Sequence, residues 1–305
     1  MNLMKIKIPS RYTPYWFLRL ENRMAIKDIL LPLLSYPSAT TPEAIEKCAV
    51  IGAYLKARVT AVAFKFDLLP AAGPFAGAFV LDPQDSPPPH ETQISRQNAE
   101  QALQRFESAA RSSNLASESL LTRATAEDAA AQLVQQARTK DLTILPIKAH
   151  DGRQEALIEN LIFNSGRPVL IFDEQSSSQL SDSFDHVSIA WDHSAQAARA
   201  VADSIPLLKA AKSVCIFTMG DHRVKAQSSS PEGLAKHLAI HGIETSVELV
   251  KAKPNANTLK AYVKSHQTDL LVMGAYRHSR LQEFIMGGAT YAVLGHPPCW
   301  VMMSH

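Results

Sequence analysis

The feature that most constrains the fold is a repeat within the chain. Asp141-Leu-Thr-Ile-Leu-Pro146 recurs 128 residues later as Asp269-Leu-Leu-Val-Met-Gly274, and Gly166-Arg-Pro-Val-Leu-Ile171 recurs 129 residues later as Gly295-His-Pro-Pro-Cys-Trp300. Both copies have the same order of apolar strand, helical stretch, Gly-x-Pro and apolar strand. A period this long does not fit a solenoid, so it indicates a duplicated domain.

Strands and helices alternate in each copy. In the second copy, Ser194 is a candidate N-cap for an Ala-rich helix, and Ser230-Pro231 and Gly242 mark the start and end of another helix. Short connections between alternating elements predict a parallel sheet with helices on both faces. The first copy repeats this order, so we expect an α/β fold with two tandem five-stranded parallel sheets.

The chain of 305 residues divides into four segments. They are an extension over 1–23 that is disordered or an over-called start, a first domain over 24–173, a polar linker over 174–184 and a second domain over 185–305. Within the first domain, residues 66–90 lack periodicity, so we expect a surface loop there.

The composition argues against several classes of partner. The formal net charge is +2, which gives no reason to expect a nucleic acid or an anionic membrane. No apolar run is long enough to span a bilayer. Cys48, Cys215 and Cys299 lie far apart in apolar stretches, so they indicate buried thiols in a reducing, cytoplasmic environment.

Two loops of the second copy carry residues suited to a ligand. Ligands of open parallel sheets bind beyond the carboxyl ends of the strands. Asp192 ends the first strand there, and its carboxylate could bind a sugar hydroxyl or a base amino group, or else cap the next helix. Gly274 ends the fourth strand and permits a sharp turn that leaves backbone amides open to a phosphate.

A second set of glycines follows this loop. Gly287-Gly288 interrupts a helical run, so it offers further free amides near a helix end. Arg277 and His278 add side-chain donors to the same stretch. Together these groups favour an anionic ligand, although turns also need glycines for ordinary reasons.

The stretch from Val272 to Thr290, together with Ile189-Ala-Trp-Asp-His-Ser194, resembles the universal stress protein family. The resemblance implies a Rossmann-like, adenine nucleotide alpha hydrolase-like fold and, as in many members, ATP as ligand. The family motif is Gly-x2-Gly-x9-Gly-(Ser/Thr), aided by an Asp after the first strand. By this resemblance the adenine nucleotide would contact these residues: Asp192, Gly274, Arg277, His278, Gly287, Gly288, Ala289 and Thr290.

The chain departs from the motif at two positions. Arg277 replaces the second glycine, which adds bulk but also a cation that can pair with phosphate. Gly288 replaces the final Ser/Thr, which removes a hydroxyl, although Thr290 is near. In the first copy Leu34 stands in place of Asp192, and Pro146 in place of Gly274. Proline offers no amide, so we expect no nucleotide in that copy.

Acidic and histidine residues at two other places give no support for a ligand site. Glu159-Asn160 lies near the place of the glycine pair in the first copy, where the carboxylate would repel phosphate. His237 and His241 are four residues apart on a predicted helix, but no third metal ligand has matching spacing, so we predict no metal.

Three functional hypotheses follow. The first is a non-enzymatic stress-response protein that binds ATP through its second domain. The second is a structural or interaction protein that has lost the nucleotide. The third is a weak ATP hydrolase or adenylyl-transfer enzyme using His278, but the Gly-x4-Gly-Lys-Ser/Thr phosphate loop is absent from the sequence.

The two copies are expected to pair within the chain. The closing strand Pro298-Cys-Trp-Val-Met-Met303 is apolar and would be an exposed edge if it stayed alone. Universal stress proteins usually associate through the last strand, so we expect this strand to meet Val169–Phe172 of the first copy. A homodimer of the whole chain stays open.

Overall fold

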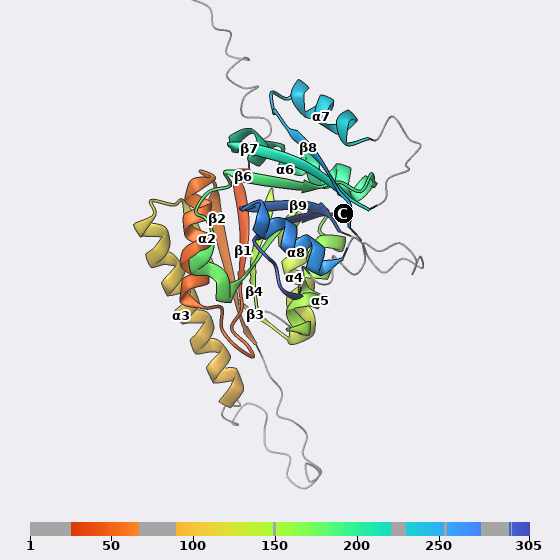
Figure 1. The fold of residues 1–305 in the computed structure, drawn as a ribbon. Helices are drawn as coiled ribbons and strands as arrows, with labels where there is room; N and C mark the ends of the chain where they lie inside the picture. Colours follow the sequence, from red (N-terminus) through yellow and green to blue (C-terminus); the bar gives the residue numbers. More distant parts are fainter. Residues whose placement is uncertain are drawn as a thin grey trace, which may run out of the picture.

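The first half of the chain contains five strands that alternate with helices (Figure 1). The computed structural model describes residues 26–66, 90–148, 151–220, 230–252, 255–275, 293 and 295–305. In chain order, the elements of the first half are β1 (Asp28–Leu33), α2 (Pro42–Tyr54), β2 (Arg58–Phe66), α3 (His90–Ser112), β3 (Ser117–Ala124), α4 (Ala126–Ala137), β4 (Leu142–Ile147), α5 (Gly152–Asn164) and β5 (Val169–Asp173).

After a short 3-10 helix, the second half repeats this order of strands and helices as far as its fourth strand, and its fifth strand follows beyond the residues left undescribed. Its elements are η1 (Glu174–Gln179), β6 (His186–Ala190), α6 (Ala195–Ala210), β7 (Ser213–Met219), α7 (Pro231–Ile240), β8 (Ser246–Val250), α8 (Ala256–Ser265), β9 (Leu270–Gly274) and β10 (Trp300–Ser304). The α/β class predicted from the sequence is therefore confirmed.

Polar side chains fix where the helices begin. At the start of each of five helices, a side-chain oxygen accepts a hydrogen bond from the amide three residues later, which satisfies one of the amides that a helix leaves unpaired. These residues are Thr41, Thr125, Ser194, Ser230 and Asn255. The predicted capping role of Ser194 is confirmed, because its Oγ lies 3.0 Å from the Ala197 amide.

Within the ranges that the structure describes, ten strands form one continuous sheet, with the order β3-β2-β1-β4-β5-β10-β9-β6-β7-β8. Each half has its first strand beside its fourth, and every pair of neighbours is parallel except β5 and β10. The order reverses between β1 and β4 and again between β6 and β9. These two reversals are the topological switch points, where ligands of such sheets bind.

The seam between the halves is the antiparallel pair β5 and β10. Val301 lies opposite Ile171, and Met303 lies opposite Val169. The closing strand thus lies beside the strand that the sequence analysis assigned to it. Trp300 is fully buried at the seam, where its ring centroid lies 4.2 Å from that of Phe172. Because β5 and β10 run in opposite directions, the strands of the first half and those of the second half are antiparallel to each other. Their carboxyl ends therefore point in opposite directions along the strands.

The segment between the halves is packed against the rest of the protein. The sequence analysis treated residues 174–184 as a polar linker, but Phe184 at its end is fully buried. The indole nitrogen of Trp300 donates a hydrogen bond to the Ser181 carbonyl at 3.2 Å, and Lys47 of α2 donates to the Leu180 carbonyl at 2.9 Å. The segment is therefore part of the junction that holds the halves together.

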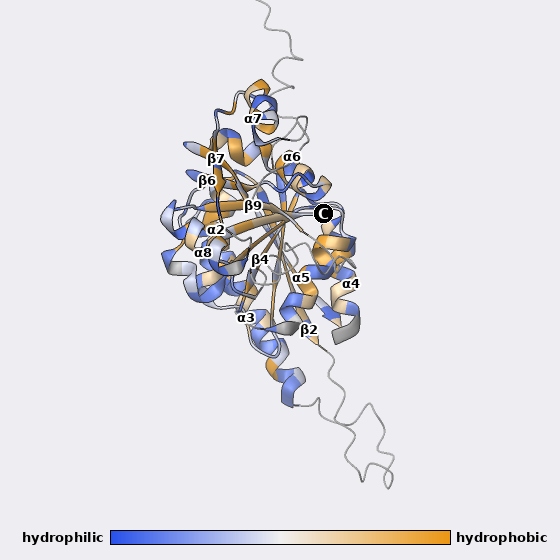
Figure 2. Ribbon diagram, turned by 45° about the vertical axis from the view of Figure 1, so that its right-hand side comes forward, coloured by the Kyte–Doolittle hydropathy of each residue, from blue (hydrophilic) through white to orange (hydrophobic). Residues whose placement is uncertain are grey.

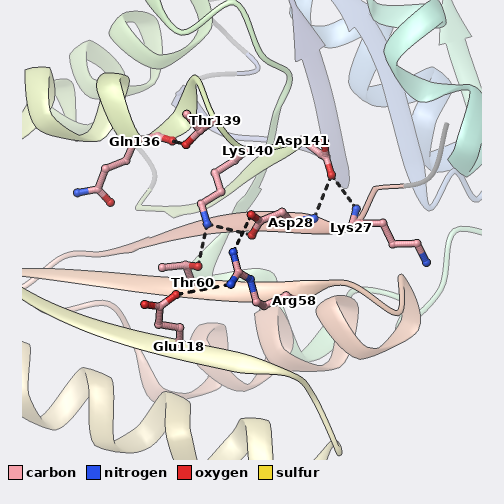
Figure 3. Close-up of polar contacts among 9 residues, drawn as sticks. All are labelled: Lys27, Asp28, Arg58, Thr60, Glu118, Gln136, Thr139, Lys140 and Asp141. Atoms are coloured by element: carbon pink, nitrogen blue, oxygen red, sulfur yellow. Dashed lines mark hydrogen bonds and ion pairs between the residues drawn. The ribbon is translucent and has the colours of Figure 1, made fainter. Parts of the chain in front are cut away.

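The repeat is visible in a pair of matching aspartates at the amino ends of the strands. Asp141 accepts hydrogen bonds from the amides of Lys27 and Asp28, at 2.9 and 3.0 Å (Figure 3). Asp269 accepts one from the amide of His186, at 2.8 Å. Each aspartate precedes the fourth strand of its half and clamps the start of the first strand, so the sequence repeat is also a structural repeat.

Helices cover both faces of the sheet, and apolar side chains fill the space between. One core layer packs under α2, α3, α6 and α7, and the other under α4, α5 and α8. In Figure 2 the central strands are mostly hydrophobic, whereas the helices carry both hydrophobic and hydrophilic residues. The edge strands are more exposed: Leu120 and Leu121 of β3, and Val247 and Leu249 of β8, contact solvent. No helix of the described ranges is both long and apolar enough to cross a membrane.

Candidate functional site

The switch point of the second half places two predicted site residues on adjacent strands. In the pairing of β6 with β9, Ala190 lies opposite Met273. Asp192 follows Ala190 by two residues, and Gly274 follows Met273 directly. Both residues therefore lie at the same carboxyl edge, beside the first turn of α6. Sequence positions 82 residues apart are thus brought together in the way that the fold class predicts.

The carboxylate of Asp192 orients Ser194, the residue that caps the N-terminus of α6. Its Oδ1 accepts hydrogen bonds from the Ser194 hydroxyl at 2.6 Å and from the Ser194 amide at 3.1 Å. Ser194 in turn caps α6. The alternative in which Asp192 itself caps the helix is corrected: Ser194 is the cap, and Asp192 orients it. The half-buried carboxylate is thereby fixed at the mouth of the switch point.

The residue between them, His193, has an unusual backbone conformation. Its φ is +66°, in the left-handed region where histidine is one of the more tolerated residues. The turn is closed by the hydrogen bonds from Ser194 to Asp192. Across the same edge lies the start of α7, where the pKa of Glu232 is held below its usual value by its own backbone amide and by Ser230, with the His193 charge acting in the same direction.

Gly274 is required by packing against α6. A Cβ atom at this position would lie 2.5 Å from the Ala197 amide nitrogen and 2.7 Å from the Gln196 carbonyl carbon. Any side chain would push the first turn of the helix away from β9. The sequence analysis explained this glycine by a sharp turn and access for phosphate. The structure supplies a different reason, the close approach of helix and strand, and that approach brings the α6 N-terminus to the switch point.

The remaining predicted contacts lie outside the described residues. They are Arg277, His278, Gly287, Gly288, Ala289 and Thr290. They belong to the segment that connects β9 to β10, so the chain leaves the described part directly after the switch point.

Comparison with known proteins bears on the family of this half. The sequence model described as Usp, the universal stress protein family, matches residues 168–305. The second half of the chain matches this family. No curated protein matched the chain.

Solved structures extend the likeness in fold to both halves. A universal stress protein from Archaeoglobus fulgidus is 15% identical, with a TM-score of 0.62, and the match covers 91% of this chain and 97% of that one. A protein of unknown function from Pseudomonas aeruginosa is 13% identical with a TM-score of 0.55, covering 92% and 93%. A putative universal stress protein from the same species is 12% identical with a TM-score of 0.54, covering 92% and 94%. The tandem arrangement of two halves is therefore a shared architecture.

The first half has no Asp–Gly pair at its switch point. Leu34 and Pro146 stand in the places of Asp192 and Gly274, as the sequence predicts. This alignment of the two halves is supported by Asp141 and Asp269, which accept matching hydrogen bonds from the amides at the start of β1 and β6. Sequence reasoning missed a buried acid in this half, Glu174, which directly follows β5. The only sequence signal for it was an acidic residue at a strand end.

Other candidate groups have simpler explanations in the universal stress protein fold. The ring of His237 on α7 meets that of His241, at the C-cap of the same helix, edge to face, with centroids 4.9 Å apart. Within the described part of the chain, no three His, Cys, Asp or Glu side chains gather in a way that could hold a metal. Cys48 and Cys299 are buried, and burial raises the pKa of both thiols, so neither is an activated nucleophile.

Proposed function

We propose that the chain is a non-enzymatic stress-response protein that binds one adenine nucleotide, ATP, at the switch point of its second half. The observation that carries this proposal is the convergence of Asp192, Gly274 and the start of α6 at the β6–β9 edge. The match of this half to the universal stress protein family supports ATP as the ligand.

The chemistry of the edge suits a nucleotide. The first turn of α6 carries the positive end of the helix dipole, which favours a phosphate. The fixed carboxylate of Asp192 can accept hydrogen bonds from ribose hydroxyls. On the sequence pattern, Arg277 and the amides of Gly287 and Gly288 would supply the further phosphate contacts, and Arg277 would offset the missing second glycine of the motif.

A catalytic role has less support. The sequence lacks the lysine-bearing phosphate loop that supports fast phosphoryl transfer. We therefore propose binding, sensing or sequestration of ATP rather than turnover.

A structural role without nucleotide is the second candidate, and one observation favours it. Packing against α6 explains Gly274 completely without any ligand. Likewise, Asp192 already has a structural task in orienting Ser194. Only a binding measurement separates the two functions.

Titration with a fluorescent ATP analogue tests the proposal. The wild type should bind saturably, and Asp192→Ala should weaken binding at least about tenfold, because a hydrogen bond to a charged group is worth about 1.5–3 kcal/mol. Asp192→Asn keeps an acceptor for Ser194 and should weaken binding less. Glu244→Ala removes an exposed carboxylate elsewhere in the second half and serves as the control. A wild type without saturable binding at millimolar ligand favours the structural role.

A further inference from the structure

The two switch points place a carboxylate on the same atom of their helix caps. In the second half, the amide of the capping Ser194 donates to Asp192 at 3.1 Å. In the first half, the amide of the capping Thr41 donates to Glu174 at 3.1 Å. Asp192 lies in the loop between β6 and its helix α6, whereas Glu174 comes from η1, at the far end of its half. In the first half, a different element thus supplies the carboxylate at the cap.

Glu174 is buried, whereas Asp192 is half-exposed. Only 3% of Glu174 is accessible, and its Oε1 has no hydrogen-bond partner within the described residues. Burial raises the pKa of Glu174, and the Thr41 amide and the Lys148 charge partly offset this rise. A carboxylate in this environment faces protein atoms and cannot receive a ligand as Asp192 can.

A lysine ties the neighbouring loop to the end of β4. Lys148 follows β4, and its ammonium group donates hydrogen bonds to the Ser38 hydroxyl at 2.6 Å and to the Ala39 carbonyl at 3.0 Å. Ser38 and Ala39 lie in the loop between β1 and α2, so the lysine bridges the two strands that flank the switch point. Ligands enter such sheets between these strands.

The rest of this loop is also hydrogen-bonded internally. The amide of Leu34 donates to the Thr40 hydroxyl at 2.9 Å, and the amide of Thr40 donates to the Leu34 carbonyl at 3.0 Å. The side chain of Asn98 on α3 donates to the Ser35 carbonyl at 2.9 Å. Asn98 of α3 and Glu174 of η1 therefore hold the two ends of the loop over 34–41. Lys148, which follows β4, holds its centre.

We propose that this hydrogen-bond network closes the first switch point, and that the side chains of Lys148 and Glu174 hold the loop over 34–41 in place. The loop over 34–41 then covers the first turn of α2, and a nucleotide has no access to it. The first half thus keeps its shape without a ligand. If the second half binds ATP as proposed above, the whole chain binds a single nucleotide, and this consequence rests on the proposed function.

Hydrogen exchange measured by mass spectrometry on the intact chain tests the closure without ligand. Lys148→Ala should speed exchange of the amides over 34–41 about tenfold, because two hydrogen bonds of a charged group are lost. Lys140→Ala is the matched control: Lys140 also makes two hydrogen bonds, to Asp28 and Thr60, but at the opposite edge of the same half (Figure 3). It should leave 34–41 unchanged. Equal exchange over 34–41 in wild type and Lys148→Ala overturns the proposal.

Addition of magnesium ATP to the same samples tests the consequence. Protection over 191–199 with unchanged exchange over 34–45 is the expected result. Protection over 34–45 in the wild type shows an open first site and overturns the closure. Protection in neither region contradicts the proposed function alone, and the ligand-free comparison of Lys148→Ala with Lys140→Ala still decides the closure.

Discussion

Single residues at the second switch point explain why the helix and the strands meet there. Gly274 is a clear case, because the backbone of α6 occupies the place of its missing side chain. The sequence pattern singles out this position for a turn and a phosphate contact, but a glycine at a strand end is equally consistent with close packing. Only the position of α6 decides between them.

Gly274→Ala should destabilise the protein by about 1–3 kcal/mol, the usual cost of overpacking. Chemical denaturation measures the change. Gly242→Ala is the comparison, since its new Cβ would meet nothing within 4 Å and only the φ of +77° opposes it. That conformational cost is about 1–2 kcal/mol. A loss for Gly274→Ala below about 1 kcal/mol contradicts the packing explanation.

Because the pKa of Glu174 is raised in the folded protein, we expect the free energy of unfolding to depend on pH. Burial raises its pKa above the value of 4.5 typical of the unfolded chain. A raised pKa means that the folded state binds the proton more tightly, so this contribution to stability is full below about pH 4.5 and is lost as the pH rises through the folded pKa. Glu174→Gln keeps an acceptor for the Thr41 amide but carries no charge.

The variant should therefore be more stable than the wild type at pH 7, by about 1.4 kcal/mol for each pH unit of the shift. The difference should shrink as the pH falls through the titration of Glu174. Unfolding free energies from pH 4 to pH 8 provide the measurement. A stability difference that is constant over this range shows that Glu174 does not titrate in the way described.

At the scale of elements, much of the fold could be predicted from the sequence. The alternation of strands and helices, the cap at Ser194 and the apolar closing strand all follow from local patterns. The use of β10 against β5 followed from the hazard of an exposed apolar edge. By contrast, the bond between Glu174 and Thr41 joins residues 133 apart in the chain and depends on where β5 ends relative to α2. No local pattern contains that information.

The burial of Trp300 in β10 predicts how much this residue contributes to the stability of the seam. Trp300 is fully buried between Phe172 and Phe184, with ring centroids 4.2 and 5.9 Å away. Trp300→Ala should cost about 3–5 kcal/mol, as expected for a large buried aromatic residue. Trp300→Phe preserves most of the aromatic contact and should cost clearly less. Denaturant unfolding measures both, and a loss below about 1 kcal/mol for Trp300→Ala contradicts a tightly packed seam.

At the scale of the whole molecule, the two halves form a single structural unit. The sheet is continuous through the pairing of β5 with β10 that the sequence predicts, and residues 174–184, which were expected as a polar linker, pack at the junction. This could not be read from the polar composition of the segment, because its contacts come from Lys47 and Trp300, which are distant in the sequence.

The continuous sheet predicts cooperative unfolding. Heating should give one transition in calorimetry, with the calorimetric and van't Hoff enthalpies equal. Separate halves, cut between residues 184 and 185, would each expose an apolar seam strand and should be much less stable than the intact chain. Two well-separated transitions in the intact chain contradict a single unit.

The central claim is that the switch point between β6 and β9 holds one nucleotide through Asp192. Equilibrium dialysis against labelled ATP, with the number of bound molecules per chain as the readout, tests it most directly. We expect about one bound ATP per wild-type chain and a large loss of binding in Asp192→Ala. No bound ATP at millimolar concentration, or binding that is unchanged in Asp192→Ala, contradicts it.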